Sequence, residues 1–385
     1  MSDIIQQEST CGLGVYSRRG IALVRGDNAR VWDDQGRTYI DCVAGHGSAN
    51  IGHGNRMVAE AVAAQAGRLL ACSNIFYNDV RAEYLERLIS VAPPGVRRAF
   101  LCNSGAEAVE AALKFARHVT GRIDIVSTFR AFHGRTLGAL STTHNPVYRD
   151  GFGPLLPGVI FTPYNNSAEL EHVVSDTTAA VILEVVQGEG GVHVGTQEFL
   201  DTTSRLCRKH GALLVVDEVQ TGFGRTGRLF ALEHFGVEPD MVCLAKSIAG
   251  GLPMGAVLCS DRISIPSGSH GTTFGGNPLC CAAATATLNY ILSENLPQKA
   301  AEKGRYLGER LARLESSRIR EIRRLGLMVG IDLREKVKPY LEKLQEVGVL
   351  ALPAGPTVLR LLPPLTIDIA DLDLVVESIQ SILPA

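Results

Sequence analysis

Short apolar runs alternate with amphipathic stretches through the middle of the chain. The stretches at residues 106–118 and 196–210 have helical periodicity, and Val109, Leu113 and Ala116 of the first fall on one face. The apolar runs have the length of buried strands and lie at residues 99–102, 124–127, 179–184, 213–217 and 241–245. This alternation predicts an α/β fold with a mainly parallel sheet that is covered by helices on both faces.

The pattern changes after about residue 277. Two long helical stretches lead there to short strands near residues 319–325, 328–333 and 358–361. Such an arrangement predicts a smaller α+β domain, which the N-terminal segment is expected to join. We therefore predict a large domain over residues 51–276 and a small domain made of residues 1–50 and 277–385.

Composition narrows the class of protein. A chain of 385 residues with 45% hydrophobic residues can bury a large core, and a net charge of -2 gives no footprint for nucleic acid. The nine cysteines form no CxxC pair, as expected for reduced thiols in the cytoplasm. The N-terminus lacks a signal pattern, and no apolar run approaches the ~20 residues that cross a membrane. We expect a cytoplasmic protein that binds neither nucleic acid nor membrane.

Two of the predicted strands end in side chains that can do chemistry. Asp217 ends one apolar run, and Lys246 directly follows another. In an open α/β sheet, neighbouring strand ends share one crevice, and ligands bind there. A buried amine can bond to an aldehyde, and a buried carboxylate can hold a pyridine nitrogen protonated. A crevice with both groups suits pyridoxal phosphate.

Each of these residues has a simpler explanation when taken alone. An aspartate just past a strand is often a solvated acid, and an isolated lysine usually lies on the surface. Lys246, however, follows an apolar strand and precedes Ala249, Gly250 and Gly251, where small residues let a cofactor lie against the backbone. A desolvated lysine also has a lowered pKa, so it can act as a nucleophile and later as a base.

A competing motif lies after the strand that ends at Asp217. Residues 222–227 fit G-x-G-x-x-G, the pattern of dinucleotide-binding loops. Such a loop begins at the strand end, whereas here Asp217 to Thr221 precede its first glycine. The next strand should also end in an acid, and it ends in Lys246. These departures argue against a nicotinamide cofactor, and the histidines show no metal-ligand spacing.

Two long motifs carry a family resemblance. Residues 217–227 read DEVQTGFGRTG, and residues 270–278 read HGTTFGGNP. Both resemble the subgroup III (class III, ω-amino) aminotransferases, and the resemblance covers nearly the whole chain. It implies a fold-type I transferase with pyridoxal phosphate on Lys246 and with Asp217 at the ring nitrogen. The acetylornithine and N-acyl-lysine branch of the family is the most similar.

The resemblance also assigns the contacts of the cofactor. A phosphate site is implied where a helix opens after the strand at residues 99–102, because backbone N–H groups there attract anions. Ser104 and Glu107 also have the spacing of a capping box, which is compatible with that site. The implied contacts are Gly105, Ala106, Phe132 stacked on the ring, Glu218, Val219, Gln220 toward the ring hydroxyl, and Thr273 toward the neighbouring subunit's cofactor.

Substrate contacts follow from the same resemblance. Arg135 and Arg360 match the arginines that bind carboxylates, for which the guanidinium fork is suited. Glu184 resembles the glutamate that pairs with Arg360 when no carboxylate is bound, and Thr272 is expected beside the substrate. Because Thr273 would serve the neighbouring subunit, the resemblance implies a homodimer.

The implied reaction transfers the ω-amine of N2-acetyl-L-ornithine to 2-oxoglutarate and gives N-acetylglutamate semialdehyde and glutamate, a step of arginine biosynthesis. Residues 73–77 favour this donor. Residues 26–53 and 349–357 instead resemble enzymes that make lysine on a small acidic carrier protein or from N-acetyl-lysine, and residues 246–251 resemble 4-aminobutyrate aminotransferases. A pyridoxal-dependent aminomutase and a non-catalytic binding protein are alternatives from other classes. The intact Lys246 and Asp217 argue against the last.

Overall fold

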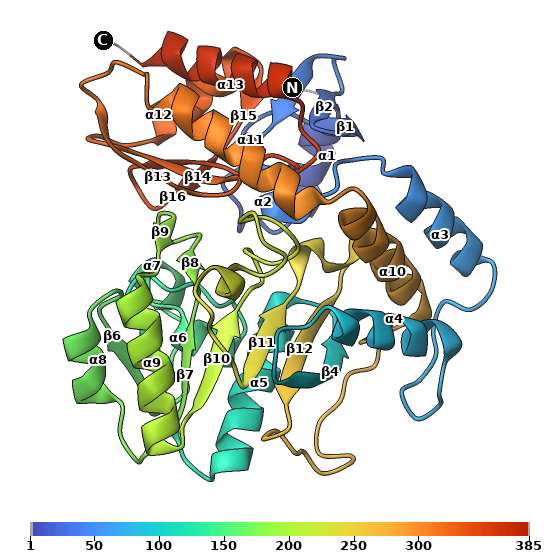
Figure 1. Cartoon of the computed structure of the whole chain (residues 1–385). Helices are drawn as coiled ribbons and strands as arrows, with labels where there is room; N and C mark the ends of the chain where they lie inside the picture. Colours follow the sequence, from blue (N-terminus) through green and yellow to red (C-terminus); the bar gives the residue numbers. More distant parts are fainter. Residues whose placement is uncertain (1–2, 384–385) are drawn as a thin grey trace.

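A seven-stranded sheet forms the centre of the larger part of the molecule (Figure 1). The structure is a computed structural model and describes residues 3–383. In order across the sheet, the strands are β4 (Val96–Cys102), β12 (Gly255–Ser260), β11 (Met241–Leu244), β10 (Leu213–Asp217), β7 (Thr178–Leu183), β5 (Asp124–Thr128) and β6 (Val159–Thr162).

The sheet is mainly parallel, as the sequence predicts. Strands β11, β10, β7, β5 and β6 run parallel, and β12 alone runs antiparallel to both of its neighbours, β11 and β4. Strands β7, β10 and β11 are buried along their whole length, which explains their continuous apolar sequence. The α/β fold of the sequence prediction is confirmed.

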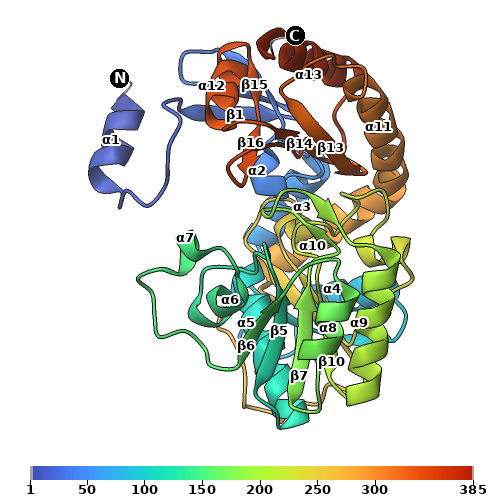
Figure 2. The same cartoon turned by 90° about the vertical axis from the view of Figure 1, so that its left-hand side faces the viewer.

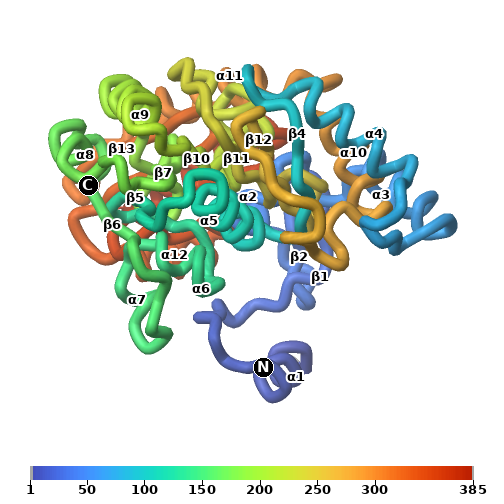
Figure 3. Tube along the Cα trace, turned by 90° about the horizontal axis from the view of Figure 1, so that it is seen from below, coloured from blue at the N-terminus to red at the C-terminus, as the bar shows by residue number. Residues whose placement is uncertain are grey.

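Helices cover both faces of this sheet (Figure 3). Helix α5 (Gly105–Thr120) lies on one face, and α8 (Ser167–Val173) and α9 (Gln197–His210) lie on the other. Local sequence defines the ends of α5: the Ser104 side chain caps its first turn, and Gly121 ends it with a left-handed backbone at φ 67°. The remaining helices of this part are α3 (Arg56–Ala66), α4 (Asp79–Ser90), α6 (Leu137–Thr142), α7 (Pro146–Arg149), α10 (Pro278–Ser293) and the 3-10 turns η1 (Ala231–His234) and η2 (Lys246–Ala249).

Two smaller sheets lie above the large one in Figure 1. One has the order β13 (Ile319–Leu325), β14 (Met328–Leu333), β17 (Val358–Leu361), β16 (Leu352–Ala354). The other has the order β1 (Leu23–Asp27), β2 (Arg30–Asp33), β3 (Thr38–Asp41), β15 (Val349–Leu350), so the two ends of the chain share a sheet. Helices α11 (Leu296–Leu311), α12 (Lys338–Glu346) and α13 (Ile369–Ile382) accompany them. The domain bounds at residues 50 and 277 remain a prediction.

Three short elements complete the fold. The turn α2 (Ala44–Gly47) and the hairpin of β8 (Val186–Gln187) and β9 (His193–Val194) lie between the large sheet and the small ones. Helix α1 (Asp3–Cys11) stands apart from the rest of the chain, and none of its residues is buried (Figure 2). No helix within residues 3–383 is long and apolar enough to span a membrane, and all nine cysteines are free thiols.

Arg225 fastens the loop after β10 to the small sheets. Its fully buried guanidinium donates to the Leu327 carbonyl at 3.0 Å, to the Pro363 carbonyl at 2.5 Å and to Asn50 Oδ1 at 2.5 Å. This loop is the G-x-G-x-x-G segment of the sequence. It packs closely against the β13–β14 turn. A Cβ added at Gly326 of that turn would lie only 2.7 Å from the Arg225 carbonyl oxygen.

We expect Arg225→Met to lower the free energy of unfolding by about 3 kcal/mol, because three buried oxygens lose their donors at ~1–3 kcal/mol each and the methionine side chain regains part of this. Urea unfolding at one protein concentration measures the change. The exposed neighbour Arg228 provides the control, since Arg228→Met should change stability by less than about 0.5 kcal/mol. Equal stability of the two variants would contradict this role for Arg225.

Candidate active site

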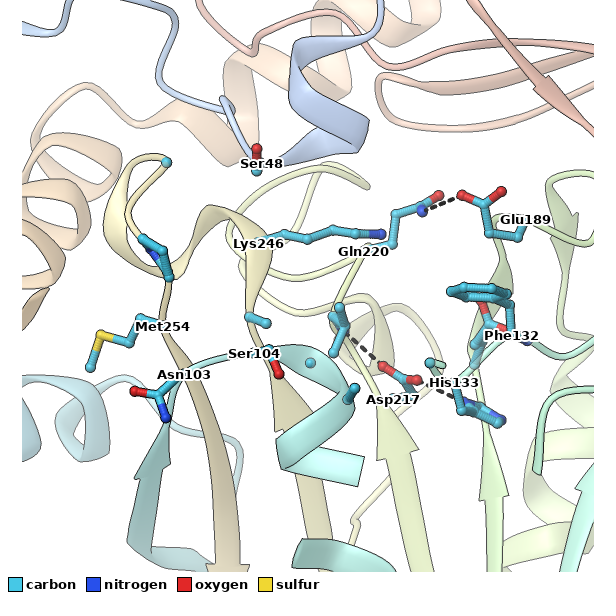
Figure 4. A pocket seen from close by; sticks show the side chains of 18 of the residues that line it. Ser48, Asn103, Ser104, Phe132, His133, Glu189, Asp217, Gln220, Lys246 and Met254 are labelled. Atoms are coloured by element: carbon cyan, nitrogen blue, oxygen red, sulfur yellow. Dashed lines mark hydrogen bonds and ion pairs between the residues drawn. The ribbon is translucent and has the colours of Figure 1, made fainter. Parts of the chain in front are cut away.

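A cavity of about 340 Å³ lies at the carboxyl ends of the parallel strands (Figure 4). Asp217 ends β10, Glu184 follows β7, and Lys246 follows β11 by two residues. Ser48, beside α2, lines the cavity from the N-terminal segment. The cavity thus occupies the edge of the sheet where ligands bind in open α/β folds.

Lys246 lies on the wall of this cavity in a strained backbone conformation. It opens η2 with φ 47°, in the left-handed region that a side chain with a Cβ rarely adopts. Burial lowers the pKa of its amine to about 8, although the Glu189 carboxylate acts in the opposite direction. At pH 7 about a tenth of this amine is therefore neutral and nucleophilic, against less than about a thousandth for a lysine with an ordinary pKa.

The Asp217 carboxylate is held by two hydrogen bonds. Oδ2 lies 2.7 Å from His133 Nδ1, and Oδ1 accepts the backbone N–H of Val219 at 3.0 Å. Burial alone would lower the pKa of His133, but the hydrogen bond and the charge of Asp217, together with Glu184, raise it. The His133 imidazole is therefore more readily protonated, and its positive charge favours the negative charge of the Asp217 carboxylate.

The first turn of α5 provides an anion site on the same cavity. Gly105 and Ala106, the first two residues of the helix, line it. The N–H of Glu107 is satisfied by the Ser104 hydroxyl at 3.1 Å, while the Glu107 carboxylate accepts the Asn103 N–H at 2.7 Å. Only the serine half of the predicted capping box forms, because the glutamate reaches one residue further back. Gly105 is required by space, since a Cβ there would lie 2.8 Å from Val219 Cγ1.

These groups fit pyridoxal phosphate. The cavity offers an amine for the aldehyde, a carboxylate for the ring nitrogen, the Phe132 ring and the Val219 side chain for the ring faces, and a helix N-terminus for the phosphate. Figure 4 shows Lys246 and Asp217 on opposite sides of the space that the ring would fill.

Arg360, on β17, forms its ion pair with Glu189. Arg360 Nη2 lies 2.7 Å from Glu189 Oε1, and Nη1 donates to Gln220 Oε1 at 3.1 Å. Arg360 is fully buried, yet its Nε and Nη2 have no aligned hydrogen-bond acceptor among the described residues. Burial alone would raise the pKa of Glu189, but the charges of Arg360 and Lys246 lower it. The guanidinium is thus held through Nη1 and Nη2, while its Nε has no acceptor in the described part of the chain.

The predicted pairing of Glu184 with Arg360 is wrong. Glu184 lies at the end of β7, where its two oxygens accept the N–H groups of Phe132 at 3.0 Å and Gly188 at 3.1 Å. Burial raises the pKa of Glu184 to about 7. Glu189 takes the position beside Arg360 because the β8–β9 hairpin projects toward the small sheets.

The predicted contact of Glu218 with the cofactor is also not supported by the direction of its side chain. Its side chain points away from the cavity, accepts the Leu232 N–H at 2.8 Å and the Thr221 hydroxyl, and is buried. Successive residues after a strand point in different directions, so Asp217, Val219 and Gln220 line the cavity and Glu218 does not. Its role is to hold the η1 segment rather than a cofactor.

The other predicted contacts lie around the cavity rather than on its wall. The exposed Arg135 guanidinium stacks 3.8 Å from the centre of the Tyr148 ring, and Tyr148 meets Phe132 edge-on. The Thr272 hydroxyl accepts from Asn103 Nδ2 at 2.9 Å, and Asn103 lines the cavity. Thr273 is exposed. The substrate role of Arg135 and the role of Thr273 toward a second subunit remain predictions.

Two functional residues were missed by the sequence analysis. His133 lies between Phe132 and Arg135, both of which are predicted site residues, and Glu189 lies in the run Gly188-Glu189-Gly190. A glutamate in a glycine-rich turn is a recognisable signal, because such a turn can approach another part of the chain closely. A Cβ at Gly190 would in fact lie 2.6 Å from the Arg130 carbonyl oxygen.

The chain matches known proteins along nearly its whole length. The family described as Aminotransferase class-III matches residues 15–383. The [LysW]-aminoadipate semialdehyde transaminase of Deinococcus radiodurans is 49% identical over 375 residues, which cover 96% of this chain and 87% of that protein. The acetylornithine aminotransferase of Methanosarcina acetivorans is 43% identical over 378 residues, which cover 98% and 95%.

Solved structures agree with the fold. The ornithine aminotransferase of Toxoplasma gondii ME49 superposes with a TM-score of 0.95 at 33% identity and covers 99% of this chain and 94% of its own. The acetylornithine aminotransferase of Elizabethkingia anophelis superposes with a TM-score of 0.88 at 34% identity, covering 99% and 98%. These matches exclude the dinucleotide interpretation of residues 222–227.

Protein freed of cofactor should take up pyridoxal phosphate faster as the pH rises toward about 8, and the rate should level off above it. Only the neutral Lys246 amine attacks the aldehyde, and its fraction falls about tenfold for each pH unit below the pKa. The absorbance change gives the rate, and borohydride reduction with peptide mapping locates the attachment.

Two variants sharpen this test. Glu189→Gln removes a charge that raises the pKa of Lys246, so the rise should move to lower pH. Lys303→Ala is the matched control, because the pKa of Lys303 is also lowered by burial but its amine donates to the Leu365 carbonyl outside the cavity. Attachment at any lysine other than Lys246 would contradict the assignment.

Proposed function

The chain belongs to the class-III aminotransferases, which use pyridoxal phosphate, and we propose that it transfers the terminal amine of an N-acylated basic amino acid to 2-oxoglutarate. The observation that carries this proposal is the Arg360–Glu189 pair. A buried arginine whose charge is balanced by a single carboxylate that can move away, and whose Nε has no acceptor within residues 3–383, suits the carboxylate of a 2-oxo acid. A neighbouring glutamate neutralises that arginine when the substrate carries no carboxylate at the reacting carbon.

The residues of the cavity divide the chemistry among them. When bound, pyridoxal phosphate accepts the amino group and its ring withdraws electrons from the carbon that is deprotonated. With the cofactor bound, Lys246 would take the proton from that carbon and pass it on to the cofactor, a task for which a pKa of about 8 is well matched. Asp217, charged and held by His133, keeps the ring nitrogen protonated.

N2-acetyl-L-ornithine is the first donor that we propose. Acylation of its α-amine leaves the terminal amine as the only nucleophile, and Arg135 offers a fork for its carboxylate near Phe132. The relatives named acetylornithine aminotransferase include proteins of which the chain covers 95% or more. The products are N-acetylglutamate semialdehyde and glutamate.

A carrier-linked donor of lysine biosynthesis is the second candidate. The 49% identity to a [LysW]-aminoadipate semialdehyde transaminase favours it, since the compared acetylornithine relative is 43% identical. Both donors present a terminal amine on an N-acylated chain, so the same cavity serves either. They differ in what lies outside it: a small acetyl group or a small acidic protein. A cytoplasmic location fits either pathway and the nine free thiols.

We further propose that the active unit is a homodimer. Thr273 and Phe274 are exposed in the single chain, and so are the large apolar side chains of Ile75, Phe76 and Tyr77. Asn74 Nδ2 donates to the Gly275 carbonyl at 3.0 Å, so the two loops form one surface. Exposed apolar groups of this size mark protein contacts.

A donor panel tests the proposed reaction. We expect kcat/KM with 2-oxoglutarate to be at least about tenfold higher for N-acetylornithine or N-acetyl-lysine than for ornithine or 4-aminobutyrate, a difference of about 1.4 kcal/mol. A carrier-linked donor belongs in the same panel. If it or acetyl-lysine exceeds acetylornithine tenfold, the lysine candidate replaces the ornithine one. A lead by 4-aminobutyrate contradicts both.

Sedimentation tests the dimer. The wild-type protein should sediment as two chains, and Tyr77→Asp should shift it toward monomer and reduce activity together with the dimer fraction, because a charge cannot be buried unpaired in an apolar interface. The matched control is Val147→Asp, a change at another exposed apolar residue, on α7. A fully active wild-type monomer at assay concentration would rule the dimer out.

A further inference from the structure

The Gln220 side chain bridges Arg360 and Glu189. Its Oε1 accepts from Arg360 Nη1 at 3.1 Å. Its Nε2 lies 3.5 Å from Glu189 Oε1, the contact that Figure 4 marks with a dashed line. Gln220 is buried, with 7% of its surface exposed, and stands three residues after Asp217. One amide therefore touches both partners of the ion pair on which carboxylate binding depends.

Gly188, which has no side chain, leaves room for the Gln220 amide. A Cβ at Gly188 would lie 1.9 Å from Gln220 Oε1 and 2.5 Å from Cδ, so no residue larger than glycine fits while Gln220 keeps its place. The backbone of Gly188 is fixed in turn, because its N–H donates to Glu184 at 3.1 Å. The β8–β9 hairpin thus leaves a slot in which the amide is held.

The chemistry of an amide suits this position. It occupies one N–H of the guanidinium and orients the fork, yet it brings no charge that would neutralise Arg360. Arg360 Nε has no acceptor among the described residues, and Nη2 faces Glu189, so these two groups become available to a substrate carboxylate when Glu189 moves away. The 3.5 Å contact to Glu189 is at the limit of a hydrogen bond, so the glutamate is only weakly held by Gln220.

We propose that Gln220 is a positioning residue that sets the exchange between Glu189 and a substrate carboxylate at Arg360. It holds the guanidinium fork in place in both states, so Glu189, which lines the cavity, can leave without Arg360 turning away. This inference rests on the proposed function, in which the 2-oxo acid binds Arg360. Gln220 therefore decides how well the acceptor competes with the built-in glutamate.

Two variants disturb this arrangement in different ways. Gln220→Glu places a permanent carboxylate beside Arg360, which competes with an incoming carboxylate. Gly188→Ala leaves the amide chemistry unchanged and expels it from its slot. Gln35→Glu is the matched control for the first change, because Gln35 is exposed on the turn between β2 and β3.

The probe is glutarate, a dicarboxylate without an oxo group, whose binding to the cofactor-loaded protein is measured by calorimetry. We expect Gln220→Glu and Gly188→Ala to weaken glutarate binding by at least about tenfold and Gln35→Glu to leave it unchanged. In single-turnover measurements, the half-reaction with 2-oxoglutarate should fall at least about tenfold more than the half-reaction with the amine donor. A purely structural defect would reduce both halves alike.

A double variant shows whether Gly188 acts through Gln220. If it does, Gly188→Ala should have no further effect on glutarate binding in a Gln220→Ala background. Wild-type glutarate binding in both single variants, or additive effects in the double variant, would overturn the inference. The proposed function fails separately, if wild-type protein does not bind glutarate or if Arg360→Lys binds it equally well. Should Gln220→Glu not fold, Gly188→Ala alone decides.

Discussion

A guanidinium group that has left water needs acceptors for its N–H groups and a negative charge close by. Arg360 is fully buried, and the chain supplies it with one carboxylate, Glu189, and one amide, Gln220. Both residues lie far from Arg360 in the sequence. The small sheets, the β8–β9 hairpin and the loop after β10 must therefore all be in place before the charge of Arg360 can be buried. The geometry of the cavity therefore depends on how the small sheets pack against the larger part of the molecule.

Arg225 extends the same constraint away from the cavity. Its guanidinium donates to three neutral oxygens and has no carboxylate partner within residues 3–383, and burial lowers its pKa to about 9. It binds the Pro363 carbonyl, three residues beyond Arg360, from the loop that also carries Gln220. Two buried arginines thus hold the same junction from both sides, one by neutral acceptors and one by an exchangeable charge. The first gives rigidity, and the second leaves room for a substrate.

The sequence predicts the parts of this site that depend on strands. Asp217 and Lys246 follow long buried strands, and strand ends meet at one edge whatever the details of packing. Glu184 was misassigned because its pairing depends on how a hairpin of few residues projects, which no periodicity encodes. Glu218 was misassigned because a motif does not say which way each side chain points. Strands β6 and β12 were not predicted, and each begins shortly after a proline, Pro157 before β6 and Pro253 before β12.

The pairing of β15 with β3 has a consequence for the order of folding. Ile40 pairs with Val349, so one strand of this sheet waits for a partner that is made much later in the chain. The seven strands of the large sheet lie between residues 96 and 260 and can assemble earlier. Until the last strands emerge from the ribosome, the first fifty residues have an unpaired strand edge, which is a site for mispairing with other nascent chains. The Arg360–Glu189 pair is likewise completed only after β17 has been made.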